Sequence, residues 1–144
     1  MTADEGLRSQ REELVLKHIN AESANDVETA LQTFTTPMYD LRPLGGEVIE
    51  GEGPVRELIA GFSTSLPSVT YVADKIHHAD DAVIVEYRVT GTHDVEYLGI
   101  PPNGAKLDHP AIAIYQFDGP NLIGEKIYMN VQGLEAQLRG EVSS

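Results

Sequence analysis

Cysteine is absent from the 144 residues of this chain, and lysine and arginine are scarce. Without cysteine, neither disulfide bonds nor thiol catalysis is possible, and a reducing cytoplasm is the expected compartment. Ten Lys and Arg residues oppose 23 Asp and Glu residues, which gives a net charge of −13. A surface of this sign repels phosphate backbones, so nucleic acid is not an expected partner.

Long apolar runs are also missing. No stretch approaches the roughly 20 residues that a membrane-spanning helix needs, and the charged N-terminal region lacks the apolar core of a signal peptide. We therefore expect no membrane association. The remaining composition is ordinary for a globular protein, with 41% hydrophobic and 23% charged residues. A chain of this length predicts one domain over residues 1–144 with a sizeable core.

Helical periodicity marks the first part of the chain, and alternating β-branched residues mark the rest. Helices are predicted over residues 4–24, 27–34, 55–62 and, as a short tail, 134–139. Strands are predicted over residues 38–42, 68–78, 82–97, 106–117 and 122–131. Helices followed by an antiparallel meander predict an α+β fold in which the helices pack on one face of the sheet.

The most informative segment is residues 91–104, Gly-Thr-His-Asp-Val-Glu-Tyr-Leu-Gly-Ile-Pro-Pro-Asn-Gly. Two prolines followed by Asn-Gly cannot continue a strand ladder, so they predict a shaped loop at the tip of a hairpin. This segment resembles a signature of the SnoaL-like proteins, the polyketide-cyclase branch of the NTF2-like superfamily. Residues 24–34 and 51–62 resemble the second and third helices of that superfamily. The resemblance implies an NTF2-like cone: three helices on a curved antiparallel sheet, a short C-terminal helix and one deep pocket.

The same resemblance suggests catalytic positions. SnoaL-like aldol cyclases carry an acid/base Asp near the end of the last strand, where this chain has Asn130. An amide cannot exchange a proton near pH 7, but it can hydrogen-bond a carbonyl or enolate oxygen. Ketosteroid isomerases, which share the fold, carry a Tyr at the position of His18 and a base Asp near Arg42, with Asp40 on the same strand face. Epoxide hydrolases of the superfamily use Arg-x-Asp, of which only Arg88 is kept.

Strand alternation restricts which side chains can meet, because alternate residues share a face. Tyr128 and Asn130 share one face of the last strand, and by the comparison above they point inward together with His109. His109 is then either a base suited to neutral pH or a core histidine held by the backbone. Asp40 is either a buried base with a raised pKa or one half of an ion pair with an arginine. These three residues, Asp40, His109 and Asn130, are the predicted catalytic groups.

Aromatic and aliphatic side chains near the loop and the strands predict an apolar pocket for a hydrophobic small molecule. His18 is either a core histidine or a contact of the ligand. The predicted substrate-binding residues are His18, Phe34, Tyr39, Phe62, Tyr87, Arg88, Leu98, Ile100 and Tyr128.

The chain predicts neither a metal site nor a cofactor. His93 and Glu96 place one imidazole and one carboxylate in the loop, which falls short of a ligand set. His77 and His78 point in opposite directions at a solvated hairpin end. No glycine-rich phosphate loop joins a strand to a helix, so no nucleotide cofactor is indicated.

Three functions remain open. The first is a cofactor-independent enzyme that removes a proton alpha to a carbonyl, as polyketide cyclases do. The second is a non-catalytic binding protein for a hydrophobic small molecule, and the third is an isomerase or epoxide hydrolase of the same superfamily. A homodimer is expected through an apolar outer sheet face. The residues predicted on that face are Ile112, Ile114, Ile127 and Met129.

Overall fold

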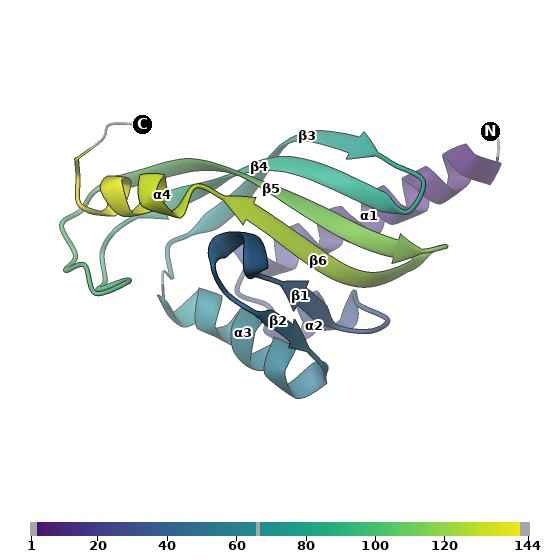
Figure 1. Cartoon of the computed structure of the whole chain (residues 1–144), viewed down its shortest axis with the longest axis horizontal. Helices are drawn as coiled ribbons and strands as arrows, with labels where there is room; N and C mark the ends of the chain where they lie inside the picture. The colour runs from purple at the N-terminus through teal and green to yellow at the C-terminus, as the bar shows by residue number, and fades with distance from the viewer. Residues whose placement is uncertain (1–2, 66, 142–144) are drawn as a thin grey trace.

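The computed structural model describes residues 3–65 and 67–141. The helices are α1 (Ala3–Ser23), α2 (Val27–Gln32), α3 (Glu52–Ser65) and α4 (Val131–Leu138), with a 3-10 turn η1 at Arg42–Leu44. The strands are β1 (Met38–Asp40), β2 (Val48–Glu50), β3 (Thr70–His78), β4 (Ala82–Thr92), β5 (Lys106–Asp118) and β6 (Asn121–Met129). The α1, α2 and α3 helices lie on one side of a curved sheet, and α4 packs against β5 at the end of the sheet near the C-terminus (Figure 1). The predicted α+β fold is confirmed.

The sheet has six strands in the order β2-β1-β6-β5-β4-β3. Strands β3 to β6 form the predicted antiparallel meander. The prediction of a wholly antiparallel sheet is wrong at one place, because β1 runs parallel to β6. There Tyr39 pairs with Glu125, and Asp40 pairs with Lys126. Strand β2, which was not predicted, pairs antiparallel with β1 after the Gly45-Gly46 turn.

Helix boundaries follow local chemistry. The predicted cap of α2 is present, since the Asp26 carboxylate accepts a hydrogen bond from the backbone N–H of Thr29 at 3.2 Å. Helix α4 begins three residues earlier than predicted, because Asn130 caps it. The Asn130 side-chain oxygen accepts from the backbone N–H of Gly133 at 3.1 Å.

The two faces of the sheet differ in polarity. On the inner face, which is the one that faces the helices, Ala113 of β5 pairs with Ile127 of β6, and both side chains are buried. On the outer face, Ile112 pairs with Tyr128, and these residues are 40% and 42% exposed. The prediction that Tyr128 points inward while Ile127 and Met129 lie on the outer face is therefore wrong. Side chains alternate between the two faces of a strand, so placing one residue on the wrong face reverses the predicted face of every other residue on that strand.

The loop between β4 and β5 is hydrogen-bonded to the C-terminal end of helix α4. Strand β4 ends at Thr92 rather than at residue 97. His93 is fully buried, and its Nδ1 lies 2.8 Å from the carbonyl oxygen of Leu138 at the end of α4. The Asn103 side chain donates to the same oxygen at 2.8 Å. The predicted signature thus includes two side chains that hold α4 in place.

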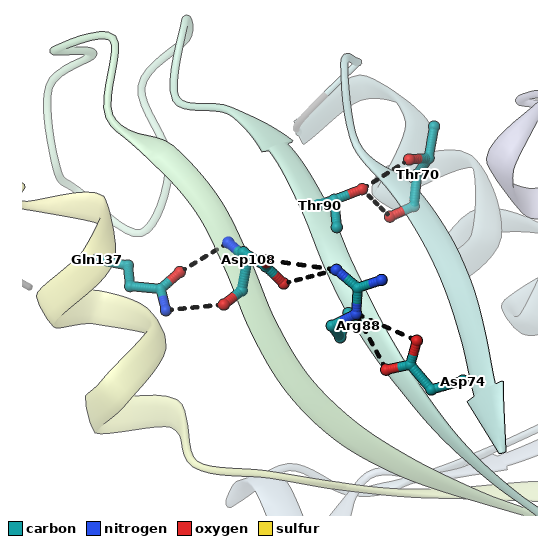
Figure 2. A network of polar contacts seen from close by, with 6 residues as sticks. All are labelled: Thr70, Asp74, Arg88, Thr90, Asp108 and Gln137. Atoms are coloured by element: carbon teal, nitrogen blue, oxygen red, sulfur yellow. Dashed lines mark hydrogen bonds and ion pairs between the residues drawn. The ribbon is translucent and has the colours of Figure 1, made fainter. Parts of the chain in front are cut away.

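A second attachment of α4 is the side chain of Gln137, which pairs with the backbone of Asp108 as a neighbouring strand would. The Gln137 amide accepts from the backbone N–H of Asp108 at 3.0 Å and donates to the Asp108 carbonyl oxygen at 3.1 Å (Figure 2). The Asp108 carboxylate continues outward to Arg88, which also contacts Asp74 (Figure 2). This polar row ties α4 to strands β5, β4 and β3.

No helix within residues 3–65 and 67–141 is long and apolar enough to cross a bilayer.

Candidate active site

A cavity of about 270 Å³ lies between the inner face of the sheet and the helices. Residues from α1, α3, strands β3 to β6 and α4 line it, and most of them are apolar. The ionisable residues on its wall are Glu22, Tyr71, Tyr87, Tyr97, Tyr115 and Glu125. Among the described residues that line the cavity, none is lysine or arginine. The wall therefore offers acids and phenols in an apolar chamber.

Both carboxylates contact one buried histidine. The Nε2 atom of His18 lies 2.9 Å from Oε1 of Glu22 and 3.0 Å from Oε1 of Glu125. Glu22 lies four residues after His18 on α1, so the two side chains share a helix face. Tyr39 and Glu125 are register partners on the parallel strands β1 and β6. The Tyr39 hydroxyl lies 3.0 Å from His18 Nε2, which completes a four-residue cluster.

Hydrogen bonds on the other side of the ring locate one proton. The Thr33 hydroxyl donates to the carbonyl oxygen of Ala30 at 2.6 Å, so its oxygen accepts from His18 Nδ1 at 2.8 Å. Nδ1 therefore carries a hydrogen. Since Nε2 faces two carboxylates, either Nε2 carries a second proton or one carboxyl group is protonated. His18, Glu22 and Glu125 thus titrate as a coupled set.

Burial and charge set the proton affinities of this cluster. Burial raises the pKa of Glu125 from 4.5 to about 7, with contact to His18 opposing the rise and the charge of Glu22 adding to it. Burial lowers the pKa of His18, but the charge of Glu22 and contacts with both carboxylates outweigh it and raise the value to about 10. Near neutral pH, His18 is an imidazolium and Glu125 exchanges a proton.

Glu125 also has unused hydrogen-bonding capacity. Its side chain is 4% exposed, and its Oε1 atom, although close to His18, has no hydrogen-bond partner among the described residues. A buried carboxylate oxygen without a directed donor is costly, because the desolvation of its charge is only partly offset. The atom is thus poised to accept a proton or a hydrogen bond from a bound molecule.

Four tyrosines surround the two carboxylates on the cavity wall. No hydrogen bond to the hydroxyls of Tyr71, Tyr87, Tyr97 or Tyr115 is formed within the described part of the chain. Burial raises the pKa of Tyr87 and Tyr115 well above the usual range, and the charges of Glu125 and Glu22 raise it further. These phenols stay protonated and can donate to a ligand oxygen.

The same cluster offers the donor atoms of a metal site. One nitrogen of His18 and one oxygen each of Glu22 and Glu125 lie within 4.8 Å of one another. Imidazole and carboxylate are ordinary ligands of divalent cations. The His18 ring nitrogen, however, is hydrogen-bonded to the Tyr39 hydroxyl. This buried set was not predicted from the sequence, where only the histidines near the hairpin ends, His77, His78 and His93, suggested a metal site.

The predicted binding residues divide between the cavity and other places. Phe62, Tyr87 and Leu98 line the cavity, and His18 and Tyr39 belong to the cluster at its wall. Two other predicted binding residues, Phe34 and Ile100, are buried in the hydrophobic core. The Phe34 ring packs edge-on against His18 with centroids 5.2 Å apart.

Two predicted binding residues lie on the other side of the sheet. Tyr128 is on the outer face, where the ammonium group of Lys126 lies 5.5 Å from its ring centre. Arg88 points away from the cavity toward Asp74 and Asp108 (Figure 2). Their predicted places in the pocket are therefore wrong, because both alternate with residues that face inward.

The three predicted catalytic residues do not reach the cavity wall. Asp40 is held by Arg42 through two side-chain hydrogen bonds of 2.9 and 2.8 Å, and this contact lowers the pKa of Asp40 to about 2. His109 is on the inner face but lies under α4, with Nε2 2.9 Å from the Asn130 carbonyl oxygen. Asn130 caps α4. Of the two alternatives predicted for each residue, Asp40 forms the ion pair with an arginine, and His109 is the histidine held by the backbone.

Sequence reasoning missed Glu22 and Glu125. A signal for Glu22 was present, since it lies four residues from His18 on the same face of the first helix. Glu125 alternates with Ile127 and Met129, so a correct assignment of that strand would have placed a glutamate among inward apolar residues. The wrong inward position of Tyr128 hid it.

The fold and cavity define an α+β protein with an acid cluster in an apolar chamber. A model of the SnoaL-like polyketide cyclase family matches residues 12–138. The chain belongs to this family, as its loop signature predicted.

Solved structures agree in fold. A candidate polyketide cyclase from Acidithiobacillus ferrooxidans superposes with a TM-score of 0.78 at 21% identity, over 99% of this chain and 100% of the other. A candidate SnoaL-like polyketide cyclase from Jannaschia sp. CCS1 gives 0.76 at 19%, over 91% and 92%. A protein with a ketosteroid isomerase-like fold from Catenulispora acidiphila, in complex with trimethylamine, gives 0.69 at 17%, over 88% and 92%. Among curated protein sequences, none is similar enough to count as a relative.

Proposed function

We propose that this protein is a cofactor-independent enzyme that removes a proton from a carbon next to a carbonyl group, with Glu125 as the base. The observation that carries the proposal is the position of Glu125, buried on the wall of an apolar cavity and 3.0 Å from His18. A general base works best when its pKa lies near the working pH, and the pKa of Glu125 is about 7.

The proposed step balances as a proton transfer. The Glu125 carboxylate takes the proton, the C–H electron pair forms the enolate, and the negative charge develops on the carbonyl oxygen. Phenol hydroxyls of Tyr87 and Tyr115, which form no hydrogen bond with the described residues, can donate to that oxygen. The imidazolium of His18 offsets the negative charge of Glu22 in the same cluster. Protonated Glu125 then returns the proton. In isomerisation the proton goes to another carbon of the enolate; in aldol cyclisation the enolate carbon attacks a second carbonyl carbon, and the proton goes to the oxygen of that carbonyl.

Proton abstraction can be measured without the natural substrate. We expect wild-type protein to accelerate exchange of the alpha protons of 2-tetralone in D₂O, followed by NMR, with a rate that rises with pH through about 7. Glu125→Gln should lower this rate by about 10²- to 10⁴-fold. Glu57→Gln is the matched control, since Glu57 is exposed on α3. A Glu125→Gln rate equal to that of wild type refutes the proposal, and no exchange by wild type on any small ketone favours a non-catalytic binding protein.

The roles predicted for Asp40, His109 and Asn130 stay predictions that the same assay decides. Their contacts support structural roles: an ion pair, a packing position under α4 and a helix cap. We therefore assign the base to Glu125 rather than to Asp40 or His109.

We also propose that the protein is a cytoplasmic homodimer whose interface is the outer face of the sheet. Val72, Ile112 and Tyr128 are 37%, 40% and 42% exposed there. The Asp74–Arg88–Asp108 row crosses the same face, where Arg88 is the register partner of Val72, so the interface would include these ion pairs (Figure 2). Light scattering at micromolar concentration should give twice the chain mass, and Ile112→Glu should give the chain mass. A monomeric wild type contradicts this assignment.

A further inference from the structure

The cavity wall carries more negative charge than the protein neutralises. Two carboxylates, Glu22 and Glu125, face it, and the imidazolium of His18 is the one basic group in contact with them among the described residues. His18 itself is fully buried behind these carboxylates. One carboxylate therefore lacks a counter-charge, and Oε1 of Glu125, although 3.0 Å from His18 Nε2, accepts no directed hydrogen bond from the described residues.

The other surroundings of Glu125 also suit a cation. Groups that face it are His18 and Glu22 from α1, and tyrosines from four strands: Tyr39, Tyr71, Tyr87 and Tyr115. Tyrosine rings attract ammonium groups through the negative potential of the ring face. An anionic ligand would meet two carboxylates and no lysine or arginine among the described residues of this wall, and the net charge of −13 would repel it before it arrived.

We propose that the cavity takes a ligand with a positively charged nitrogen, a protonated or quaternary amine on an apolar body, with Glu125 and Glu22 as its counter-charges. The inference rests on the proposed function in so far as it names the substrate class of the same cavity. It concerns binding alone, however, and can be tested without turnover.

Proton linkage follows from the same geometry. A cation beside Glu125 favours its ionised form, so binding releases a proton wherever Glu125 was protonated. Affinity should be constant above about pH 7 and should fall as the pH decreases, by up to about tenfold for each pH unit. A neutral ligand would show no such loss, and a ligand that accepts a hydrogen bond from the Glu125 carboxyl group would bind better in acid.

The probes are choline and its uncharged carbon isostere, 3,3-dimethyl-1-butanol. Isothermal titration calorimetry of the full chain at about pH 8 should show choline binding at least about tenfold more tightly than the alcohol. The choline affinity should fall between about pH 7 and 5.5. Near pH 7, the heat should depend on the ionisation enthalpy of the buffer, as proton release requires.

Variants assign the effect to the cluster. Glu125→Gln should weaken choline binding at least about tenfold at about pH 8 and remove the pH dependence. Glu57→Gln, which removes one surface charge, should bind choline as wild type does. If Glu125→Gln does not fold, Glu22→Gln removes the other counter-charge and should likewise weaken choline binding at about pH 8. The comparison of the two probes on wild type needs no variant.

Several results would overturn the inference. They are equal binding of the two probes, tighter choline binding in acid, unchanged binding by folded Glu125→Gln, and no choline binding to wild type. Binding of Mn²⁺ or Zn²⁺ without any binding of choline would replace the amine by an inorganic cation. Choline binding without ketone exchange would refute the proposed function alone, and ketone exchange without choline binding would refute the inference alone.

Discussion

Glu125→Gln should make the protein more stable at alkaline pH, although it removes the proposed base. In the folded state Glu125 holds its proton more tightly than in the unfolded chain, since its pKa rises from 4.5 to about 7. A raised pKa contributes stability that is fully present below about pH 4.5 and is lost as the pH rises through about 7. Glutamine resembles the protonated acid and does not titrate, so it removes this loss.

The size of the effect follows from the two pKa values. A tenfold change in proton affinity corresponds to about 1.4 kcal/mol, so the change from 4.5 to about 7 corresponds to about 3 kcal/mol of unfolding free energy. The contribution of His18 to the pH dependence of stability has the same sign, because its pKa rises from 6.5 to about 10. Its contribution is complete below about pH 6.5 and decreases by about 2 kcal/mol by about pH 8. Because Glu125 contributes to the raised pKa of His18, the two contributions are coupled and do not simply add. Wild type should lose more stability than the variant between about pH 4.5 and 8.

Urea unfolding at several pH values between about 4.5 and 8 measures this difference. The two proteins should be of similar stability at the acid end, and the variant should exceed wild type by about 3 kcal/mol at the alkaline end. Glu57→Gln again serves as the control, because it changes the net charge equally at an exposed site. Its curve should run parallel to that of wild type. Parallel curves for wild type and Glu125→Gln would refute the raised pKa and the proton-sharing cluster with it.

Substitutions at three further positions test separate parts of the structure. Asn130→Ala should cost about 1 kcal/mol in urea unfolding through loss of the α4 cap, and Asn130→Asp should restore it; equal stability of all three would exclude the cap. Leu98 has a φ of 52°, in the left-handed region, so Leu98→Asn should raise the unfolding free energy by up to about 1 kcal/mol. Asp40, whose pKa Arg42 lowers to about 2, contributes stability above about pH 4 that is lost as the pH falls toward 2. Asp40→Asn should therefore lose less stability than wild type between about pH 5 and 2.5, measured by thermal unfolding.

The fold could be predicted because its signals are local or belong to a recognisable segment. Hydrophobic periodicity located the helices, and the Pro-Pro-Asn-Gly loop marked the family. Strand β2 was missed because three residues, Val48–Glu50, give too short a pattern. The parallel pairing of Tyr39 with Glu125 was missed because nothing in either segment encodes a partner that lies far along the chain.

The site was predicted less well for one physical reason. On a strand, one wrong choice of face exchanges all inward and outward residues. The resemblance placed Asn130 inward, and Tyr128 followed it, whereas Ile127 and Glu125 are the buried residues. His18 was found because helical spacing sets it on the apolar face with Val15 and Ile19.

The parallel contact between β1 and β6 has a consequence for how the protein is made. During synthesis, His18 and Tyr39 leave the ribosome long before Glu125, so the first part of the chain exists for a time without the acid that completes the cluster. Non-local pairing of this kind is slow, because the chain loses the entropy of closing a long loop before it gains any stabilising contact. The central sheet and the cavity can therefore be completed only when the last strand docks. The nascent N-terminal helices must wait, with their apolar faces incompletely covered, for the final part of the chain.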